Sequence, residues 1–188
     1  MAVAVVTDST HYLPRVLVDA LGLHEVSLYV RVGDGLRRES ELTDLAAFWE
    51  RMRTAEALPT TSQPSIGDFA ACYEPLLRAG RDVVSIHLSA GVSGTCDAAR
   101  QAAAQLADDG YADRVAIVDS RSTCGGMGML LLAAAARARA GGELADVVAH
   151  THAARERLRI WFALDTLEYL RRGGRVGGAQ AWLGGALK

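Results

Sequence analysis

The chain has 188 residues, half of them hydrophobic, and a formal net charge of −2 at pH 7. This length is enough for one well-buried domain, or for one domain and part of another. The near-neutral charge argues against nucleic-acid binding, which needs clustered basic side chains, and the composition is not that of a disordered chain. Three widely spaced cysteines without a CxxC pair argue against a metal site or a disulfide framework.

The sequence predicts neither a signal peptide nor a membrane-spanning helix. The N-terminal segment from Met1 to Asp8 lacks the positively charged start of a signal peptide and reaches an acid at position 8. The longest apolar run, from Met127 to Ala136, is too short to span a bilayer. These features predict a soluble, cytoplasmic protein.

Strands and helices are predicted to alternate along the chain. Val3 to Val6 is typical of a strand buried on both faces, and helical spacing follows from Leu13 to Leu21. Further strands are predicted at residues 24–32, 82–88, 115–118 and 159–164, a turn at 33–35, a proline-bounded loop at 58–65, and helices at 43–53, 66–78, 96–106, 126–140, 143–158, 166–172 and 178–187. This pattern favours an α/β fold, a parallel sheet with helices on both faces, for residues 1–164. Residues 165–188 are expected to begin an incomplete second domain.

Hydroxyl and carboxylate side chains follow four of the predicted strands. They lie at residues 7–10, 89–95, 119–123 and 165–166. Open α/β sheets bind ligands at the carboxyl ends of their strands. We therefore expect a binding site rich in hydroxyl groups at this edge of the sheet.

Two of the polar segments offer groups for an anion. Ser93 and Gly94 precede a predicted helix, where a hydroxyl beside free N–H groups binds carboxylate or phosphate. The alternative is that Ser93 or Thr95 only caps its own helix. Thr61 lies in the loop that two prolines restrict, although this segment could equally be the capped start of the helix at 66–78.

Other motifs point less clearly to chemistry. The segment from Asp119 to Ser122 could hold a nucleophile and a base, but none of the five histidines lies in a recognisable catalytic motif. A solvated or capping role is therefore favoured for Asp119. The glycines between Gly125 and Gly128 lack the spacing of a phosphate loop, and close packing of their helix on the sheet explains them better.

The polar segments occur in an order that resembles the DegV-like family of bacterial fatty-acid-binding proteins. The matching segments are 7–9, 59–65, 89–95, 119–122 and 165–175, and the resemblance extends from Val3 to Leu187. It implies a two-domain α/β protein that binds one long-chain fatty acid in a tunnel between its domains. It also implies a carrier without metal or cofactor that is not an enzyme. In some bacteria the carrier presents the fatty acid to a kinase, which converts the carboxylate to an acyl-phosphate.

The resemblance assigns roles to individual residues by matching motif. It places the carboxylate on the hydroxyls of Thr61 and Ser93, with the N–H of Gly94 as a helper. It places Arg171, Arg172 and Arg175 near the tunnel entrance or on a surface that faces the kinase.

This sequence departs from the family pattern because most of the second domain is absent. An apolar face left without that domain could instead drive formation of a homodimer. The alternative function is a hydrolase or phosphoryl-transfer enzyme that uses Asp8, Asp119 and Ser93, and a further alternative is a non-catalytic interaction module.

Overall fold

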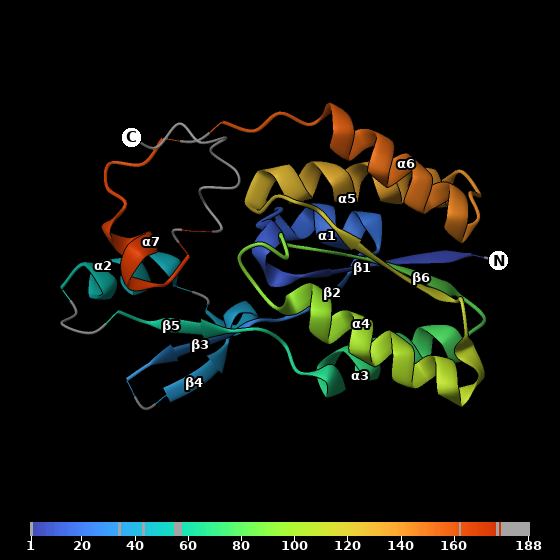
Figure 1. Cartoon of the computed structure of the whole chain (residues 1–188), viewed down its shortest axis with the longest axis horizontal. Helices are drawn as coiled ribbons and strands as arrows, with labels where there is room; N and C mark the ends of the chain where they lie inside the picture. Colours follow the sequence, from blue (N-terminus) through green and yellow to red (C-terminus); the bar gives the residue numbers. More distant parts are fainter. Residues whose placement is uncertain are drawn as a thin grey trace.

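A computed structural model describes residues 2–33, 35–42, 44–54, 58–161, 163–175 and 177. Within this part of the chain, a parallel sheet of four strands has the order β2-β1-β6-β7, and an antiparallel sheet of three strands has the order β4-β3-β5. The two sheets lie end to end, with the antiparallel sheet away from the N terminus (Figure 1).

The strands are β1 (Val3–Asp8), β2 (His24–Val26), β3 (Tyr29–Val32), β4 (Gly35–Arg38), β5 (Thr60–Ser62), β6 (Asp82–His87) and β7 (Val115–Asp119). The helices are α1 (Arg15–Leu21), α2 (Leu45–Thr54), α3 (Ile66–Arg78), α4 (Thr95–Leu106), α5 (Cys124–Arg139), α6 (Leu144–Arg157) and α7 (Glu168–Arg172). Short helical turns occur at η1 (Ser9–His11), η2 (Glu39–Glu41) and η3 (Ala107–Tyr111).

Helices cover both faces of the parallel sheet, as predicted. Successive side chains of a strand point to opposite faces. Val3 and Val5 of β1 therefore pack into a core with α1, α5 and α6, whereas Ala4 and Val6 pack into a second core with α3 and α4. Figure 1 shows α3 and α4 below the parallel sheet and α5 and α6 above it. The α/β assignment with a helix layer on each face is confirmed.

The helix at residues 66–78 begins and ends as predicted, with Ser65 as its cap. The Oγ of Ser65 accepts a hydrogen bond from the N–H of Asp68 at 3.0 Å, and the Asp68 carboxylate accepts one from the N–H of Ser65 at 2.9 Å. This reciprocal capping box satisfies N–H groups that have no partner inside the helix.

The antiparallel sheet was not predicted. Residues 24–32, expected as one strand, form β2 in the parallel sheet and β3 in the antiparallel sheet. Between them, the carbonyl of Leu28 accepts from the N–H of Glu39, and the Oγ of Ser27 accepts from the N–H of Ser40. The predicted loop at 58–65 contains β5, which pairs with β3. The predicted turn at 33–35 joins β3 to β4, and Asp34 within it lies outside the described residues.

The predicted strand at 159–164 is wrong for the residues that the structure describes there. They form no strand, and Ile160 and Trp161 are 46% and 93% exposed. The apolar pattern suggested a strand, but no neighbouring strand pairs with this segment. The predicted helix at 166–172 is present as the shorter α7, and the one at 178–187 lies outside the described residues.

Close packing explains two glycines at the start of α5, but their neighbours are loops and not the sheet. A side chain at Gly126 would collide with the Oγ of Ser122, in the loop after β7. A side chain at Gly128 would lie 3.0 Å from Leu13, just before α1. The glycines therefore let α5 approach the polar edge of the sheet.

Asp68 joins the antiparallel sheet to α3. Its carboxylate accepts hydrogen bonds from the hydroxyl of Tyr29 at 3.0 Å and from Arg38 at 2.9 Å, and its side chain is 13% exposed. Burial raises the pKa of Asp68, but hydrogen bonds from Ser65, Arg38 and Tyr29 outweigh it and lower the pKa to about 2. The ionised carboxylate is therefore the form that stabilises this junction.

We expect Asp68 to make the stability of the protein depend on pH below about 4. Because the folded-state pKa lies below the ordinary value of 3.8, the contribution is complete above pH 4 and is lost as the pH falls toward 2. Asp68→Asn should lower the free energy of unfolding by about 1–2 kcal/mol at pH 7 and by much less at pH 2. Urea unfolding at several pH values measures this, with the exposed Asp19→Asn as control. A difference between wild type and Asp68→Asn that stays constant from pH 7 to pH 2 would contradict the assignment.

Candidate ligand-binding site

Two polar loops meet at the carboxyl edge of the parallel sheet. β6 and β7 end side by side, with His87 paired to Asp119. Beyond these ends, the N–H of Ser89 donates to the carbonyl of Ser122 at 2.8 Å, and the N–H of Ala90 donates to the Asp119 carboxylate at 3.2 Å. The structure thus joins the loop at 89–95 to the loop at 119–123.

Ser93 and Gly94 lie at the N terminus of α4. Gly94 occupies the cap position and offers no side-chain cap. The Oγ of Ser93 lies 2.9 Å from the Oγ1 of Thr95 and accepts a long hydrogen bond, 3.4 Å, from the N–H of Thr95. Within the described part of the chain, the N–H of Gly94 has no acceptor. Ser93 therefore contacts Thr95 of its own helix, and the N–H of Gly94 at the positive end of the helix dipole is left for an anion.

The threonine segment of β5 lies beside this helix terminus. A side chain at Gly94 would lie 2.5 Å from the Oε1 and 2.8 Å from the Nε2 of Gln63, so the Gln63 side chain packs directly on Gly94. Thr60, Thr61 and Ser62 are exposed on an edge strand. The structure therefore brings the end of this segment to the Ser93 loop and leaves its hydroxyls accessible.

An apolar pocket of about 250 Å³ lies between the antiparallel sheet and α2. Thr61 is paired with Val30, and paired residues of antiparallel strands point to the same face. Val30 lines the pocket, so Thr61 and the pocket share one face of the sheet. The other lining residues include Val32, Leu42, Phe48, Met52 and Pro59, together with Arg37 and Arg51.

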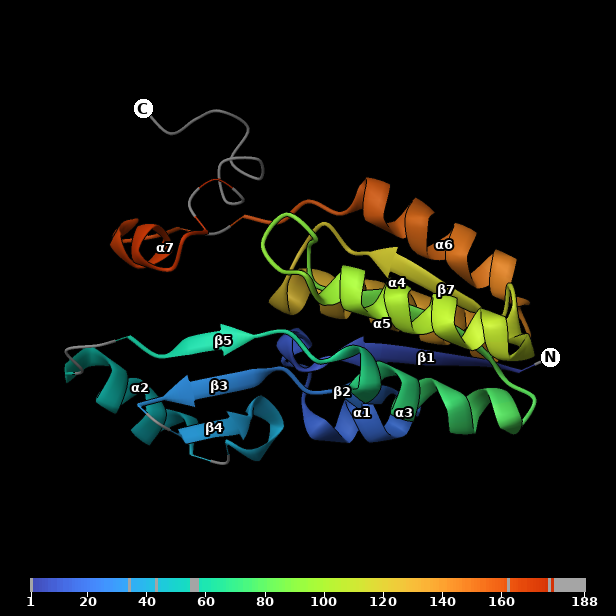
Figure 2. The same cartoon turned by 60° about the horizontal axis from the view of Figure 1, so that its bottom comes forward.

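The three arginines near the C-terminal end of the described chain are exposed. Arg171 forms an ion pair of 2.8 Å with Glu168 in α7, and Arg175 donates to the carbonyl of Gly173. Gly174, between Arg172 and Arg175, has a φ of 73°, which suits glycine at this break. α7 lies at the same end of the molecule as the antiparallel sheet in both views (Figures 1 and 2).

Ser9 ties the end of β1 to the antiparallel sheet. Its Oγ donates to Glu39 at 2.5 Å and accepts from the N–H of Leu28 at 3.1 Å. The other oxygen of Glu39 accepts from the hydroxyl of Tyr12. Ser9, which the sequence placed among the polar groups at the strand ends, thus holds the two sheets together.

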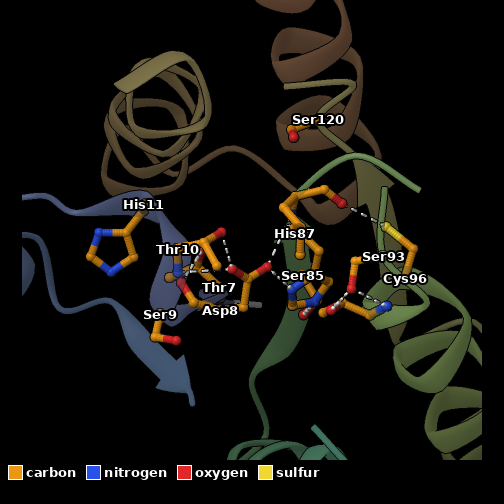
Figure 3. A network of polar contacts seen from close by, with 12 residues as sticks. Thr7, Asp8, Ser9, Thr10, His11, Ser85, His87, Ser93, Cys96 and Ser120 are labelled. Carbon is orange, nitrogen blue, oxygen red and sulfur yellow. Dashed lines mark hydrogen bonds and ion pairs between the residues drawn. The ribbon is translucent and has the colours of Figure 1, made fainter. Parts of the chain in front are cut away.

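A buried hydrogen-bonded chain connects Asp8, His87, Ser85 and Tyr73. Figure 3 shows Asp8, His87 and Ser85 of this chain. Tyr73 donates to the Oγ of Ser85 at 2.7 Å, which lies 2.6 Å from the Nε2 of His87. The Nδ1 of His87 lies 3.1 Å from the Asp8 carboxylate. All four residues are fully buried. Because Tyr73 already donates to Ser85, the Ser85 proton goes to Nε2 and the His87 Nδ1–H goes to Asp8.

Asp8 accepts further hydrogen bonds from both sides. One carboxylate oxygen accepts from the N–H and hydroxyl of Thr10 at 3.0 and 2.6 Å, and the other also accepts from the N–H of Leu88 at 3.0 Å. Burial raises the pKa of Asp8, but His87, Thr10 and Leu88 outweigh it and leave the pKa lowered. An ionised Asp8 therefore fixes the end of β1 against the end of β6.

Only half of this network has a signal in the sequence. Ser85 and His87 are two residues apart in a strand, the spacing that places both side chains on one face. Asp8, however, lies 79 residues before His87. No local pattern connects residues so far apart, so the network could be found only in the folded chain.

Two members of the alternative enzyme site, Asp8 and Asp119, are engaged in hydrogen bonds of the fold. The order Asp8, His87, Ser85 is that of a nucleophilic triad, but Ser85 is fully buried and a substrate cannot contact it. Asp119 accepts from the N–H groups of Ala90 and Arg121, the capping role predicted for it.

No group of three or more His, Cys, Asp and Glu side chains among the described residues is arranged to hold a metal ion. None of the helices described is long and apolar enough to cross a bilayer.

Solved structures of similar fold include one from Thermus thermophilus and one from Bacillus subtilis. A DegV family protein from Thermus thermophilus, described as fatty-acid binding, superposes with a TM-score of 0.85 at 38% sequence identity, over 100% of this chain and 65% of its own. DegV from Bacillus subtilis, described as a fatty acid binding protein, gives a TM-score of 0.84 at 36% identity, over 100% of this chain and 66% of its own.

Sequence comparison gives the same relationship. Protein DegV of Bacillus subtilis is 36% identical over 191 residues, and a DegV domain-containing protein of Deinococcus radiodurans is 37% identical over 187 residues. The chain is covered completely in both, and it spans 66% and 65% of these relatives. The family model described as "Uncharacterised protein, DegV family" matches residues 2–188. With a family match over almost its whole length, this chain belongs to the DegV family.

Proposed function

We propose that this chain binds a long-chain fatty acid by its carboxylate and acts as a carrier, without a catalytic step of its own. The two similar structures from Thermus thermophilus and Bacillus subtilis are described as fatty-acid binding. The observation that carries the proposal is the contact between Gln63 and Gly94. It shows that the threonine segment and the Ser93 loop are neighbours, as a shared carboxylate site requires.

The carboxylate would lie at the N terminus of α4. Ser93 offers a hydroxyl there, Gly94 an N–H without an acceptor in the described chain, and the helix the positive end of its dipole. Thr61 would add a hydroxyl from β5. Hydrogen bonds to a charged group contribute about 1.5–3 kcal/mol each, so three of them suffice to select an ionised acid.

The acyl chain would begin in the pocket between the antiparallel sheet and α2. This pocket is mostly apolar and shares a face of the sheet with Thr61. Burial of each CH₂ group contributes about 0.8 kcal/mol, so the tail supplies most of the affinity. With about 250 Å³, the pocket lies below the roughly 300–1,000 Å³ of sites that enclose a drug-sized ligand. It would therefore hold only part of a long chain.

The partner of such a carrier would be a kinase that phosphorylates the bound carboxylate to an acyl-phosphate. Arg171, Arg172 and Arg175 are exposed at the end of the molecule that carries β5 and the pocket. Exposed guanidinium groups bind acidic surfaces and phosphate groups. This supports our assignment of the three arginines to the entrance or to the kinase-facing surface.

A homodimer is a further proposal, and it rests on the exposed apolar side chains. Ile160, Trp161, Leu164 and Tyr169 are between 46% and 93% exposed. Apolar side chains gathered along one segment favour burial against another chain.

Equilibrium binding of palmitate to the purified chain tests the proposal. Palmitate should bind at least tenfold more tightly than its methyl ester, because the ester keeps the tail and loses the charge that strengthens each hydrogen bond. Isothermal titration calorimetry below the critical micelle concentration measures both ligands. Equal affinity for acid and ester, or no binding of either, would contradict a carboxylate site.

A further inference from the structure

A second pocket, which is polar, lies between the loop after β7 and the C-terminal end of α6. It has a volume of about 220 Å³. Its lining includes Ser120, Arg121, Ser122, Arg155, Glu156 and Arg159. No residue of the proposed carboxylate site is among them, so this pocket is separate and its occupant needs its own explanation.

Arg155 is held in place at the base of this pocket. Its side chain is 15% exposed, and its Nη1 donates to the backbone carbonyl of Asp119 at 2.8 Å. Its Nε is buried and has no hydrogen-bond partner in the described part of the chain. The guanidinium is thus fixed by a neutral acceptor through Nη1, while its Nη2 faces the exposed Glu156 at 3.6 Å.

Arg121 and Arg159 add two further guanidinium groups at the rim. Arg121 has a φ of 50°, and its N–H donates to the Asp119 carboxylate at 2.8 Å, which fixes the backbone from which its side chain extends. The Arg121 guanidinium has no partner among the described residues. Arg159 donates from Nη1 to the carbonyls of Glu156 and Leu158, so it meets no carboxylate either.

The acids near the pocket do not balance these charges. Glu156 is the only acidic residue in the lining, and its Oε1 lies 3.6 Å from the Nη2 of Arg155. Asp119 is close by, but its Oδ1 already accepts two backbone N–H groups. The pKa of His152 is lowered by burial and then by the charges of Arg155 and Arg121, as expected beside an excess of positive charge.

We propose that this pocket binds the phosphate group of a small molecule. Guanidinium groups form paired, charge-assisted hydrogen bonds with phosphate oxygens, and three of them line this pocket. A carboxylate has two oxygens and a single charge, whereas a phosphate has three or four oxygens and close to two charges. The number of donors therefore matches phosphate better than carboxylate.

NMR titration of the isotope-labelled chain tests the proposal. Inorganic phosphate and glycerol 3-phosphate are added separately at constant ionic strength, and the amides of residues 120–122 are followed. We expect saturable shifts of these amides. The double variant Arg121→Gln/Arg159→Gln should weaken binding at least tenfold. The control Arg157→Gln, which is exposed at the end of α6 and outside the pocket, should change binding less than twofold.

Three results would overturn the proposal: shifts that do not saturate, equal binding by the double variant and the wild type, or acetate binding as tightly as phosphate. Tighter binding of glycerol 3-phosphate than of phosphate would identify an organic phosphate as the ligand. Equal affinity of the wild type for glycerol 3-phosphate and for inorganic phosphate would show that the bare phosphate group is recognised. Either of these two results supports the site. The exposed arginines make no core contacts, and thermal unfolding of each variant checks that it folds.

Discussion

Replacing Asp8 by alanine is expected to lower the free energy of unfolding by about 3–5 kcal/mol, a large fraction of the stability of a small domain. The carboxylate accepts hydrogen bonds from the N–H groups of Thr10 and Leu88 and from the ring of His87, all of them buried. Its removal leaves these donors without acceptors, and each buried donor without a partner costs about 1–3 kcal/mol.

Urea unfolding followed by circular dichroism measures the effect of Asp8→Ala. Asp19→Ala is the matched control, because Asp19 is 61% exposed and pairs only with the exposed Arg15. Its expected change is within about 0.5 kcal/mol. Ser85→Ala, which removes the hydroxyl between His87 and Tyr73 in the same hydrogen-bonded chain, should fall between the two. A loss below about 1 kcal/mol for Asp8→Ala would show that the network does not hold β1 against β6.

Loss of either hydroxyl from the proposed carboxylate site should weaken palmitate binding by about 10–100-fold, since one hydrogen bond to a charged group contributes about 1.5–3 kcal/mol. Thr61→Val keeps the shape of the side chain and removes the hydroxyl from an exposed strand. Ser93→Ala removes the hydroxyl at α4 together with a weak contact to Thr95. Both changes leave the buried cores intact, so stability should change little.

Thr60→Val is the matched control for Thr61→Val. The two residues are neighbours in β5, and neighbouring residues of a strand point to opposite faces. Only Thr61 shares its face with Val30 and the apolar pocket. Calorimetric titration should therefore show normal affinity for Thr60→Val. Equal losses for both threonine variants would remove Thr61 from the site, and an unchanged Ser93→Ala would remove Ser93.

Elements that depend on local contacts or on burial were predictable. The helix α3 needs only Ser65 and Asp68, three residues apart, to define its start. β1 and β6 are buried on both faces, and this leaves a continuous apolar run in the sequence. Both kinds of signal are contained in a few neighbouring residues.

Elements that depend on a distant partner were not predictable. β4 and β5 are short, polar and exposed, with the sequences GLRR and TTS, and only pairing with β3 makes them strands. The segment at 159–161 has the apolar pattern of a strand but no partner within the described chain. The pattern of apolar residues does not distinguish these strands from the segment at 159–161, because it reflects the burial of side chains and not the hydrogen bonding between backbones.

The candidate site shows the same division. The polar loops after β6 and β7 were expected to meet, because the ends of parallel strands share an edge. Ser93 and Gly94 were predicted to lie at this edge because they follow the strand at 82–88 and precede a helix. The contact between Gln63 and Gly94 joins residues from different sheets, and nothing in either segment encodes it.

The strand order has a consequence for synthesis of the chain. β1 is made first, yet it lies between β2 and β6, and β6 begins only at Asp82. At about 5–20 residues per second, the ribosome needs roughly 4–16 s to reach that point. During this interval the nascent chain carries an apolar N-terminal strand with one edge unpaired and Asp8 without His87. Among the paired strands that the structure describes, β1 thus waits longest for a partner, and in this period the polypeptide is open to chaperones and to aggregation.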